Sequence, residues 1–332
     1  MKILVTGAGG FIGSNLIHKL NAKGYTEILA VDDLSDGLKY RNLLQANIDD
    51  YQDLDGFYDK LLNNYFGKFD YIFHEGACSD TMEHNGKYML ANNYEISKKL
   101  FMYSARENSC LNYASSAAVY GKSRGFEVSE RNEAPLNVYG FSKLLFDNFV
   151  RKNNVSAVKQ IVGLRYFNVY GPRESHKGKM ASVAYNQYMQ FTNNQPIRLF
   201  GSYGGYGEGC QMRDFIYIDD LIEVKLWLME NQNVRGIFNL GTGRAQAFND
   251  VALGVINGLN RIHDKPCDTL ENAIKEKKIQ YVQFPEALIG RYQCYTRAEI
   301  SDLRNHGYQG KFRDVESGMF DYVSWLVKEE QQ

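Results

Sequence analysis

The chain has 332 residues, and its 38 lysines and arginines nearly balance 39 aspartates and glutamates, which leaves a formal net charge of −1. This balance gives no general case for nucleic acid or an anionic membrane as a partner. No apolar run reaches the ~18 residues of a membrane-spanning helix, and the first residues have the pattern of a core strand rather than of a signal peptide. We therefore expect a cytoplasmic protein without membrane contact. Its five cysteines lack C-x-x-C spacing, which indicates reduced thiols and no metal site.

The amino-terminal segment has the pattern of a dinucleotide-binding turn. Residues 2–6 are an apolar run that predicts a buried parallel strand, and residues 14–20 have helical apolar spacing. Between them, Gly7 permits a tight turn, Gly10 lets the backbone approach a pyrophosphate, and Gly13 allows close packing of helix on strand. The pyrophosphate would bind the amide groups at the helix start, although such a turn also occurs in α/β proteins that bind no nucleotide.

Strand and helix patterns alternate through the rest of the chain. A second strand is predicted at 28–31, and further strands at 70–74, 111–114 and 160–165. Helices are predicted at 92–106 and 139–151, a strand with a helix start at 213–221, and a strand with a turn at 237–243. The alternation predicts an α/β fold, a Rossmann-type doubly wound parallel sheet with a smaller α/β substrate-binding lobe. We expect the dinucleotide-binding domain to cover 1–166 with returning segments at about 210–245, and the lobe to cover 167–209 and 246–332.

Tyr139 and Lys143, in the stretch N-V-Y-G-F-S-K, are the first candidate catalytic residues. Four residues apart on a predicted helix, they lie on one face. An ammonium beside a phenol favours the phenolate, which predicts a pKa for Tyr139 below its usual value near ~10. A tyrosine of that kind takes a proton from a sugar hydroxyl near neutral pH. Tyr-x-x-x-Lys also occurs on ordinary helix faces, so the interpretation depends on the surrounding residues.

Ser115 and Ser116 stand at the end of a predicted strand, before this helix. Ligands of parallel sheets bind outside the carboxyl ends of the strands, so Ser116 is expected to reach the same hydroxyl as Tyr139 and to orient the substrate. Serines at strand ends also serve simply as caps. The glycine turn upstream and the Tyr139–Lys143 pair downstream favour the catalytic interpretation.

At this point the chain resembles the extended short-chain dehydrogenase/reductases over nearly its whole length. The motifs G-A-G-G-F-I-G, Y-G-F-S-K, R-Y-F-N-V-Y-G-P-R, R-D-F-I-Y-I-D-D-L and F-N-L-G-T-G come in the order of nucleotide-sugar epimerases and dehydratases. Dehydratases of this superfamily carry an Asp-Glu pair just after the strand-end hydroxyl residue. Ala117 and Ala118 occupy those places here and exchange no protons, so elimination of water is disfavoured.

More specifically, H-E-G-A-C-S, K-Y-M-L-A-N-N-Y, S-S-A-A-V-Y-G, G-P-R-E-S-H-K-G-K-M-A-S-V-A and G-R-Y-Q are similar to the ADP-heptose 6-epimerases of lipopolysaccharide inner-core synthesis. The resemblance implies bound NADP, a transient 6-keto sugar and two bases, which here are Tyr139 and Lys177. Two bases suit the chemistry. When the sugar side chain turns about its C5–C6 bond, the C6 oxygen points to a different wall of the pocket, where a different group must exchange its proton. By composition alone Lys177 would be a solvated loop lysine. The resemblance also suggests a homo-oligomer, a pentamer.

The choice of cofactor has arguments on both sides. Asp32 and Asp33 stand at the end of the second strand, where an acid commonly binds a ribose 2′-hydroxyl and favours NAD. The resembling epimerases also carry an acid there, with a lysine a few residues on to meet a 2′-phosphate, and Lys39 matches it. Asp33 adds a second acid, and Leu54 stands where a further lysine is expected. NADP is favoured and NAD stays open.

The resemblance implies the lining of both ligand sites. The cofactor site is expected to contain Gly7, Gly10, Phe11, Ile12, Gly13, Asp32, Asp33, Lys39, Leu54, Glu75, Gly76, Ala77, Cys78, Ser79, Asn92, Lys143, Val169 and Lys177. The ADP-heptose site is expected to contain Ser116, Asn168, Lys179, Asn186, Phe200, Gly201, Ser202, Tyr203, Arg213 and Tyr292.

Physical chemistry supports part of the substrate list. The planar guanidinium of Arg213 suits a diphosphate, although a surface ion pair is the alternative. Phe200 or Tyr292 would stack on adenine, or simply fill the core. The glycine-rich loop at 201–209 is expected to be mobile and is either a lid or a tolerated insertion, and the charged segment at 263–278 has no assigned role.

Two other functions stay open. One is a 4-epimerase type of nucleotide-sugar epimerase using NAD, which rotates the whole keto-sugar and needs only one tyrosine base. The other is a sensor that binds NADP without chemistry.

Overall fold

The computed structural model describes residues 1–153, 158–290 and 292–330. They form two compact units, and each is built from several stretches of the chain. The first contains Met1–Tyr166, Ile222–Asn239 and Ser301–Gly310, and the second contains Phe167–Leu221, Leu240–Ile300 and Lys311–Gln332. The functional domain division expected from the sequence stays a prediction.

A seven-stranded sheet forms the centre of the first unit in the described part of the chain. Its order is β11-β6-β5-β4-β1-β2-β3, and the neighbours from β6 to β3 pair in parallel. The strands are β1 (Ile3–Thr6), β2 (Ile28–Asp32), β3 (Asp50–Asp53), β4 (Tyr71–His74), β5 (Cys110–Ser116), β6 (Gln160–Tyr166) and β11 (Gly236–Leu240). The predicted α/β class with a doubly wound parallel sheet is confirmed. The order reverses at β1 and β4, where such sheets hold their ligands.

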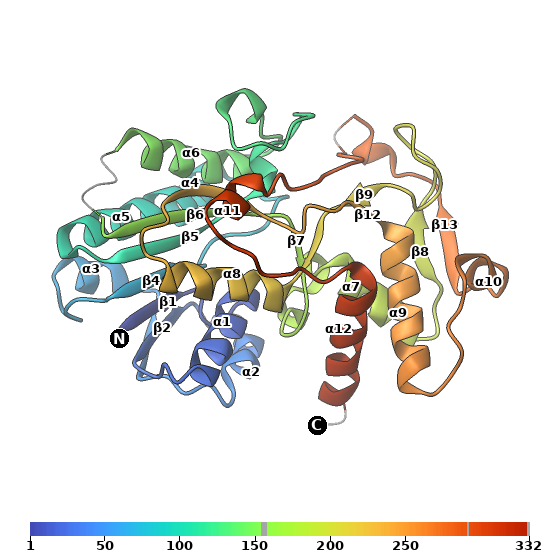
Figure 1. Ribbon diagram of the computed structural model, residues 1–332, viewed down its shortest axis with the longest axis horizontal. Helices are drawn as coiled ribbons and strands as arrows, with labels where there is room; N and C mark the ends of the chain where they lie inside the picture. Colours follow the sequence, from blue (N-terminus) through green and yellow to red (C-terminus); the bar gives the residue numbers. More distant parts are fainter. Residues whose placement is uncertain (154–157, 291, 331–332) are drawn as a thin grey trace. The chain divides into compact units, whose positions relative to one another are not determined.

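Helices cover both faces of this sheet. Figure 1 shows α5 and α6 on one face and α1 and α8 on the other. The helices that contribute to this unit are α1 (Phe11–Ala22), α2 (Tyr40–Leu43), α3 (Phe57–Leu62), α4 (Gly86–Leu90), α5 (Ile96–Glu107), α6 (Val138–Lys152), α8 (Ile218–Glu230) and α11 (Ser301–Asn305). Short 3₁₀ turns lie at η1 (Gly37–Lys39), η3 (Ala117–Val119) and η4 (Glu130–Asn132).

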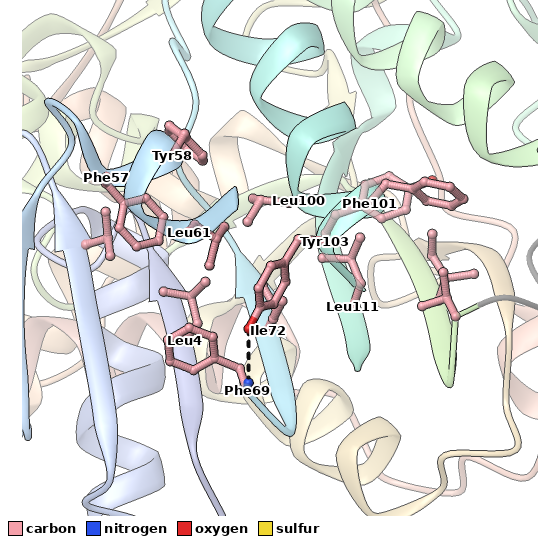
Figure 2. Packing of buried hydrophobic residues seen from close by; sticks show 14 of the residues in the cluster. Leu4, Phe57, Tyr58, Leu61, Phe69, Ile72, Leu100, Phe101, Tyr103 and Leu111 are labelled. Carbon is pink, nitrogen blue, oxygen red and sulfur yellow. Dashed lines mark hydrogen bonds between the residues drawn. The ribbon is translucent and has the colours of Figure 1, made fainter. Parts of the chain in front are cut away.

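An apolar core joins the sheet to the helices of one face. Leu4, Ile72 and Leu111 come from three neighbouring strands and pack against α3 and α5 (Figure 2). The Tyr103 hydroxyl in this core accepts a hydrogen bond from the Phe69 amide at 3.3 Å. The alternative, a buried hydroxyl without a partner, would cost free energy. The strands β1, β2 and β4 are buried at every residue, as expected when helices cover both faces.

The second unit contains smaller, two-stranded sheets in the described part of the chain. Its strands are β7 (Asn168–Tyr170), β8 (Ile197–Phe200), β9 (Met212–Arg213), β10 (Phe215–Tyr217), β12 (Gln246–Ala247) and β13 (Ile279–Val282). β7 pairs with β10 and β8 with β13 in parallel, while β9 and β12 are antiparallel. The helical segments are η6 (Ser175–Met180), α7 (Val183–Thr192), α9 (Phe248–Ile262), α10 (Leu270–Lys275), η7 (Glu286–Leu288) and α12 (Val315–Glu329).

The predicted helix at 92–106 differs from the structure in its first turn. Ala91–Glu95 is a π-helical turn (η2) that continues α4 into α5. Asn93 lies in this turn with only 1% of its surface exposed. Its side chain binds both the amide and the carbonyl of Cys78, and it also donates to the Ser142 hydroxyl at 3.0 Å. The widened turn presents Asn93 to these groups, and such turns often occur at functional sites.

No described helix combines the length and the apolar character that a membrane crossing requires.

Candidate active site

The glycine turn between β1 and α1 has no room for side chains at two of its positions. Gly7 has a φ of +68°, and a Cβ atom there would lie 2.6 Å from the Gly76 amide nitrogen. A Cβ atom on Gly13 would lie 2.1 Å from the Gly7 carbonyl oxygen. The predicted roles of Gly7 in the turn and of Gly13 in helix packing are confirmed. α1 begins after Gly10 without a side-chain cap, which suits an anionic ligand at the helix start.

Asp32 braces this turn. Its Oδ2 atom accepts hydrogen bonds from the Gly9 amide at 2.7 Å and the Gly10 amide at 3.1 Å. Its Oδ1 atom lies 3.0 Å from the ammonium of Lys39, which also donates to the Asp33 carbonyl at 2.8 Å. A hydrogen bond from the Ser35 backbone lowers the pKa of Asp33. The sequence suggested the acid and the lysine as ligand contacts, whereas their contact with each other and with the turn is visible only in the structure.

A cleft of about 190 Å³ opens beside the turn. The predicted cofactor residues in its lining are Gly7, Asp32, Asp33, Lys39, Leu54, Gly76, Ala77, Cys78 and Asn92. Sequence reasoning missed Thr6, Tyr58, Tyr88 and Ile96, which also line it. Tyr88 belongs to the K-Y-M-L-A-N-N-Y motif, so a signal for it was present. The residues of this cleft fit a dinucleotide because the turn has no room for side chains, the helix start has no side-chain cap, and acidic and basic groups line the cleft.

Other predicted cofactor residues of the first unit lie around this cleft without lining it. Gly10 caps α1, and Phe11, Ile12 and Gly13 form its first turn. Ser79 is exposed. The Glu75 carboxylate is buried and forms an ion pair with Lys225 at 2.6 Å.

Tyr139 and Lys143 lie on the first two turns of α6, which the Asn137 side chain caps by accepting from the Gly140 amide. A Cβ atom on Gly140 would lie 2.6 Å from the Ala118 carbonyl, so this glycine lets the helix pack on the turn η3 that follows β5. Lys143 is buried, and its ammonium donates to the Ala114 carbonyl at 2.9 Å. Burial lowers the pKa of Lys143 to about 8.

The expected lowering of the Tyr139 pKa is wrong for this structure. Burial raises the pKa of Tyr139, and a hydrogen bond from the Ser116 side chain opposes that shift. The ammonium of Lys143 binds a backbone carbonyl and is not among the groups that shift the phenol. Ser116 therefore contacts Tyr139 and favours its phenolate, whereas its expected contact with the substrate hydroxyl stays a prediction.

Ser115, the other strand-end serine, has a different partner. Its hydroxyl donates to Asp147 at 3.0 Å, and the same buried carboxylate accepts from Arg165 Nε at 3.0 Å. Arg165 also pairs with Glu133. This buried network ties α6 to β5 and β6, and sequence reasoning missed it because its members are far apart in the chain.

Lys177 lies in the second unit, within the short turn η6. It is half-buried, and burial lowers its pKa while the neighbouring Glu174 carboxylate opposes the shift. Glu174 is fully buried and accepts from the Ser182 amide and hydroxyl, each at 2.6 Å, and from the Tyr322 hydroxyl at 2.9 Å. Lys177 thus lies beside an anchored buried carboxylate and is not a fully solvated lysine, whereas Lys179 is exposed.

Four aromatic residues of the second unit form one cluster with Arg213. Tyr203 stacks on Phe284 with ring centroids 3.9 Å apart, and Phe200 and Phe284 both meet Tyr292 edge to face. The guanidinium of Arg213 lies 4.8 Å from the centre of the Tyr292 ring. Arg213 is 9% exposed and forms no ion pair with a carboxylate of the described residues. Sequence reasoning missed Phe284.

The remaining predicted substrate residues of this unit are dispersed. Asn168 and Ser202 are exposed, and Val169, a predicted cofactor residue, is half-buried on β7. Asn186 donates to the Ala181 and Ser182 carbonyls, which lie just before its own helix. Arg291, the arginine of the G-R-Y-Q motif, lies outside the described residues.

The glycine-rich loop at 201–209 closes into a hairpin. Tyr203 and Tyr206 exchange two backbone hydrogen bonds, at 3.0 and 3.1 Å. The Gly201 amide donates to Val282 at 2.7 Å, and the Gly209 amide donates to Phe200 at 2.9 Å. The hairpin carries Tyr203 into the aromatic cluster, and its function as a lid stays a prediction.

Residues 3–241 match the model of a family described as the NAD dependent epimerase/dehydratase family. The chain belongs to this family. The matched range contains the glycine turn, the cleft, the Tyr139–Lys143 pair and Arg213. Family membership accounts for a dinucleotide site at the turn between β1 and α1.

Solved structures of nucleotide-sugar epimerases are similar to this chain over nearly its whole length. ADP-L-glycero-D-manno-heptose-6-epimerase from Helicobacter pylori is 30% identical, with 98% of this chain and 96% of that chain covered and a TM-score of 0.80. UDP-glucuronic acid 4-epimerase from Bacillus cereus, in complex with UDP-glucuronic acid and NAD, is 25% identical, with coverages of 98% and 100% and a TM-score of 0.73. UDP-glucose 4-epimerase from Thermotoga maritima is 24% identical, with coverages of 99% and 100% and a TM-score of 0.78, which shows likeness of fold.

Proposed function

We propose that this protein is a nucleotide-sugar epimerase that inverts C6 of the heptose in ADP-D-glycero-D-manno-heptose, through a transient 6-keto sugar and with NADP as enclosed cofactor. The single observation that carries the choice of C6 is Lys177, a half-buried lysine beside the anchored carboxylate of Glu174. A 4-epimerase needs one base, whereas inversion at C6 employs a second. Similarity to the heptose epimerase at 30% identity supports the same choice.

The proposed reaction removes a hydride from C6 and the proton from its hydroxyl, and later returns both with inverted configuration. NADP, when bound, supplies the acceptor and donor of the hydride. Tyr139 takes or gives the hydroxyl proton for one epimer, assisted by the hydrogen bond from Ser116. The buried ammonium of Lys143 offsets negative charge next to the cofactor cleft.

Lys177 is proposed to serve the other epimer. After the side chain turns about C5–C6, the same face of the cofactor meets the opposite face of the carbonyl, and the oxygen points away from Tyr139. A second group must then exchange its proton. Burial lowers the pKa of Lys177, so the neutral amine needed for proton abstraction is less costly to form than for an exposed lysine.

Contacts at the cofactor cleft support NADP. Asp32 accepts from two amides of the glycine turn, and the ammonium of Lys39 offsets its charge at 3.0 Å. Lys39 lines the cleft and is suited to a 2′-phosphate. Asp33 and Leu54 also line the cleft. Among the described residues of this lining, Lys39 is the one with a positively charged side chain. NAD remains the cofactor of the second candidate function.

The substrate is proposed to bind the second unit through Arg213 and the aromatic cluster. A buried guanidinium without a carboxylate partner among the described residues is costly unless an anion neutralises it, and a diphosphate does so bidentately. Tyr292 or Phe200 would stack on the adenine. We further propose that the enzyme acts in the cytoplasm as a homo-oligomer, a pentamer by resemblance, in lipopolysaccharide inner-core synthesis; light scattering of the purified protein measures the assembly.

The test is to incubate the purified protein with ADP-D-glycero-D-manno-heptose and to follow the configuration at C6 by NMR. The proposal expects interconversion of the two C6 epimers, which Lys177→Ala slows at least ~100-fold in kcat. The matched variant Lys179→Ala, two residues on and exposed, is expected to raise KM with little change in kcat. No inversion by the wild type would defeat the proposal.

The second candidate is a 4-epimerase using NAD, which the 25% identity to UDP-glucuronic acid 4-epimerase supports. The same variants separate the two. A near-normal rate of Lys177→Ala on a UDP-sugar, together with no reaction on the ADP-heptose, would favour the 4-epimerase. Protein that binds NADP and changes no nucleotide sugar would favour a sensor without chemistry.

A further inference from the structure

Lys225 is a fully buried lysine on α8 that none of the proposed chemical steps uses. Its ammonium donates to Glu75 Oε1 at 2.6 Å, to Asn112 Oδ1 at 2.5 Å and to the Tyr166 hydroxyl at 3.0 Å. An ammonium has three N–H donors, so each has an acceptor. A lysine buried and satisfied in this way is costly to desolvate, which makes a purely space-filling role a poor explanation.

The partners of Lys225 lead towards the active site. The Tyr166 hydroxyl donates to Glu75 Oε2 at 2.9 Å, so Lys225, Tyr166 and Glu75 form a closed triangle of hydrogen bonds. Tyr166 pairs in register with Ser116, the strand-end serine whose side chain contacts Tyr139. Burial, the Glu75 carboxylate and then Tyr139 raise the pKa of Tyr166. Glu75 also begins the segment whose next residues, Gly76 to Cys78, line the cofactor cleft.

Glu75 is shared by two buried lysines. Burial lowers the pKa of Lys143, and among the groups that oppose the shift Glu75 comes first, followed by Asp147 and Cys78. The Asp147 charge is already engaged by Arg165 at 2.9 Å. The net negative charge that Glu75 presents to Lys143 therefore depends on the ammonium of Lys225, which offsets it.

Three other groups lie around the pair. His74, between the Thr6 and Ser97 hydroxyls, stays neutral because burial, with Lys143 and Lys225, lowers its pKa to about 3. Ser116 and Cys78 face Tyr139 from the strand end and from the cleft segment. Among the charges near the site, that of the Lys225–Glu75 pair is the one that a substitution at Lys225 changes.

We propose that Lys225 is a positioning residue of the active site, and that it acts through Glu75 to set the charge around Tyr139 and Lys143. Its ammonium offsets the Glu75 carboxylate, so the pair contributes no net charge. Loss of the ammonium leaves one net negative charge, which stabilises the Lys143 ammonium and disfavours the Tyr139 phenolate. The catalytic consequence rests on the proposed function, whereas the effect on Lys143 does not.

The first experiment measures Lys143 directly in cofactor-free protein. Lysine labelled with ¹³C at Cε is titrated by NMR, and the Lys143 signal is assigned by its loss in Lys143→Met. Lys225→Met is expected to raise the pKa of Lys143 by about one unit. Asn112→Asp, an isosteric change that keeps the acceptor for Lys225 and adds a negative charge, is expected to shift it in the same direction. This variant keeps the test available if Lys225→Met does not fold.

A double variant separates charge from structure. Lys225→Met combined with Glu75→Gln removes both charges, so the Lys143 pKa is expected to return towards the wild-type value. Glu223→Gln, which removes a half-exposed charge from the same helix, is the control and is expected to leave the titration unchanged. An unmoved Lys143 in both Lys225→Met and Asn112→Asp, or a double variant shifted as far as the single one, would overturn the proposal.

The second experiment is the pH dependence of kcat/KM. In Lys225→Met, the rising limb of this profile is expected to move to higher pH by about one unit. At a fixed pH on that limb, kcat/KM then falls about tenfold. A merely structural role would lower the rate at every pH by one factor. If Lys143 shifts as expected while no epimerisation is found, the inference stands and the proposed function fails.

Discussion

Replacing Lys143 with methionine is expected to stabilise the cofactor-free protein while it abolishes activity. Burial lowers the pKa of this lysine from 10.5 to about 8. An ammonium whose pKa is lower in the folded than in the unfolded state opposes folding at every pH below the folded value. The difference of about 2.5 pH units corresponds to a penalty of about 3 kcal/mol at pH 7, at 1.36 kcal/mol per unit.

Two corrections determine the net effect and its pH dependence. Methionine loses the hydrogen bond to the Ala114 carbonyl, which contributes about 1 kcal/mol, so the expected gain at pH 7 is about 2 kcal/mol. Between pH 8 and pH 10.5 the unfolded chain holds the proton and the folded chain does not, so wild-type stability rises with pH. At pH 9.5 the remaining penalty is about 1.4 kcal/mol, and the advantage of the variant nearly disappears.

Urea unfolding of wild type and Lys143→Met at pH 7 and pH 9.5 measures both quantities. Lys152→Met, which replaces an exposed lysine at the end of the same helix, is the control and is expected to change the free energy of unfolding by less than ~0.5 kcal/mol at either pH. The reasoning would be refuted by a Lys143→Met variant that is less stable than wild type at pH 7. It would also be refuted if the difference in free energy of unfolding between variant and wild type were the same at both pH values.

Three further predictions concern the cofactor turn and the second unit. Gly13→Ala places a Cβ atom 2.1 Å from the Gly7 carbonyl and is expected to weaken cofactor binding at least ~10-fold by calorimetry, whereas Gly86→Ala, whose Cβ would lie 3.6 Å from its nearest neighbour, is expected to bind normally. Lys39→Ala is expected to weaken NADP binding about tenfold and NAD binding little; equal losses would count against a 2′-phosphate contact. Asp214→Ala is expected to destabilise the protein by at least ~3 kcal/mol in urea unfolding, because this buried carboxylate accepts from Thr242, Gly243 and Ala298, and a loss below ~1 kcal/mol would contradict that role.

Most of the fold of the first unit was predictable because its signals are local. The apolar runs of β1, β2, β4, β5 and β6 were located to within a residue or two. β3 was not predicted, since Asp50–Asp53 is polar and lies at the sheet edge. The helices α7, α9 and α12 of the second unit were not predicted either, because the sequence pattern of the later segments is less regular.

The candidate site was predictable in its residue types and less so in its contacts. Gly7, Gly13, Tyr139 and Lys143 follow from spacing along a short stretch of chain. The direction of the Tyr139 pKa does not, because burial outweighs the nearby lysine, whose ammonium binds a carbonyl of β5. The proximity of Ser116 to Tyr139 was predictable, since parallel strand ends and the following helix meet at one edge of the sheet, whereas their direct hydrogen bond is visible only in the structure.

The sequence by itself determined the dinucleotide turn and the spacing of the tyrosine–lysine pair, because a positive φ, a forbidden Cβ and an i, i+4 spacing are properties of a few consecutive residues. Tertiary structure alone decided which charges meet. Lys225 reaches Glu75 across 150 positions of sequence, and Asp32 turns its carboxylate to the glycine amides. Burial and ion pairing depend on groups that are distant in the chain, and these set the energetics of every ionisable group in the site.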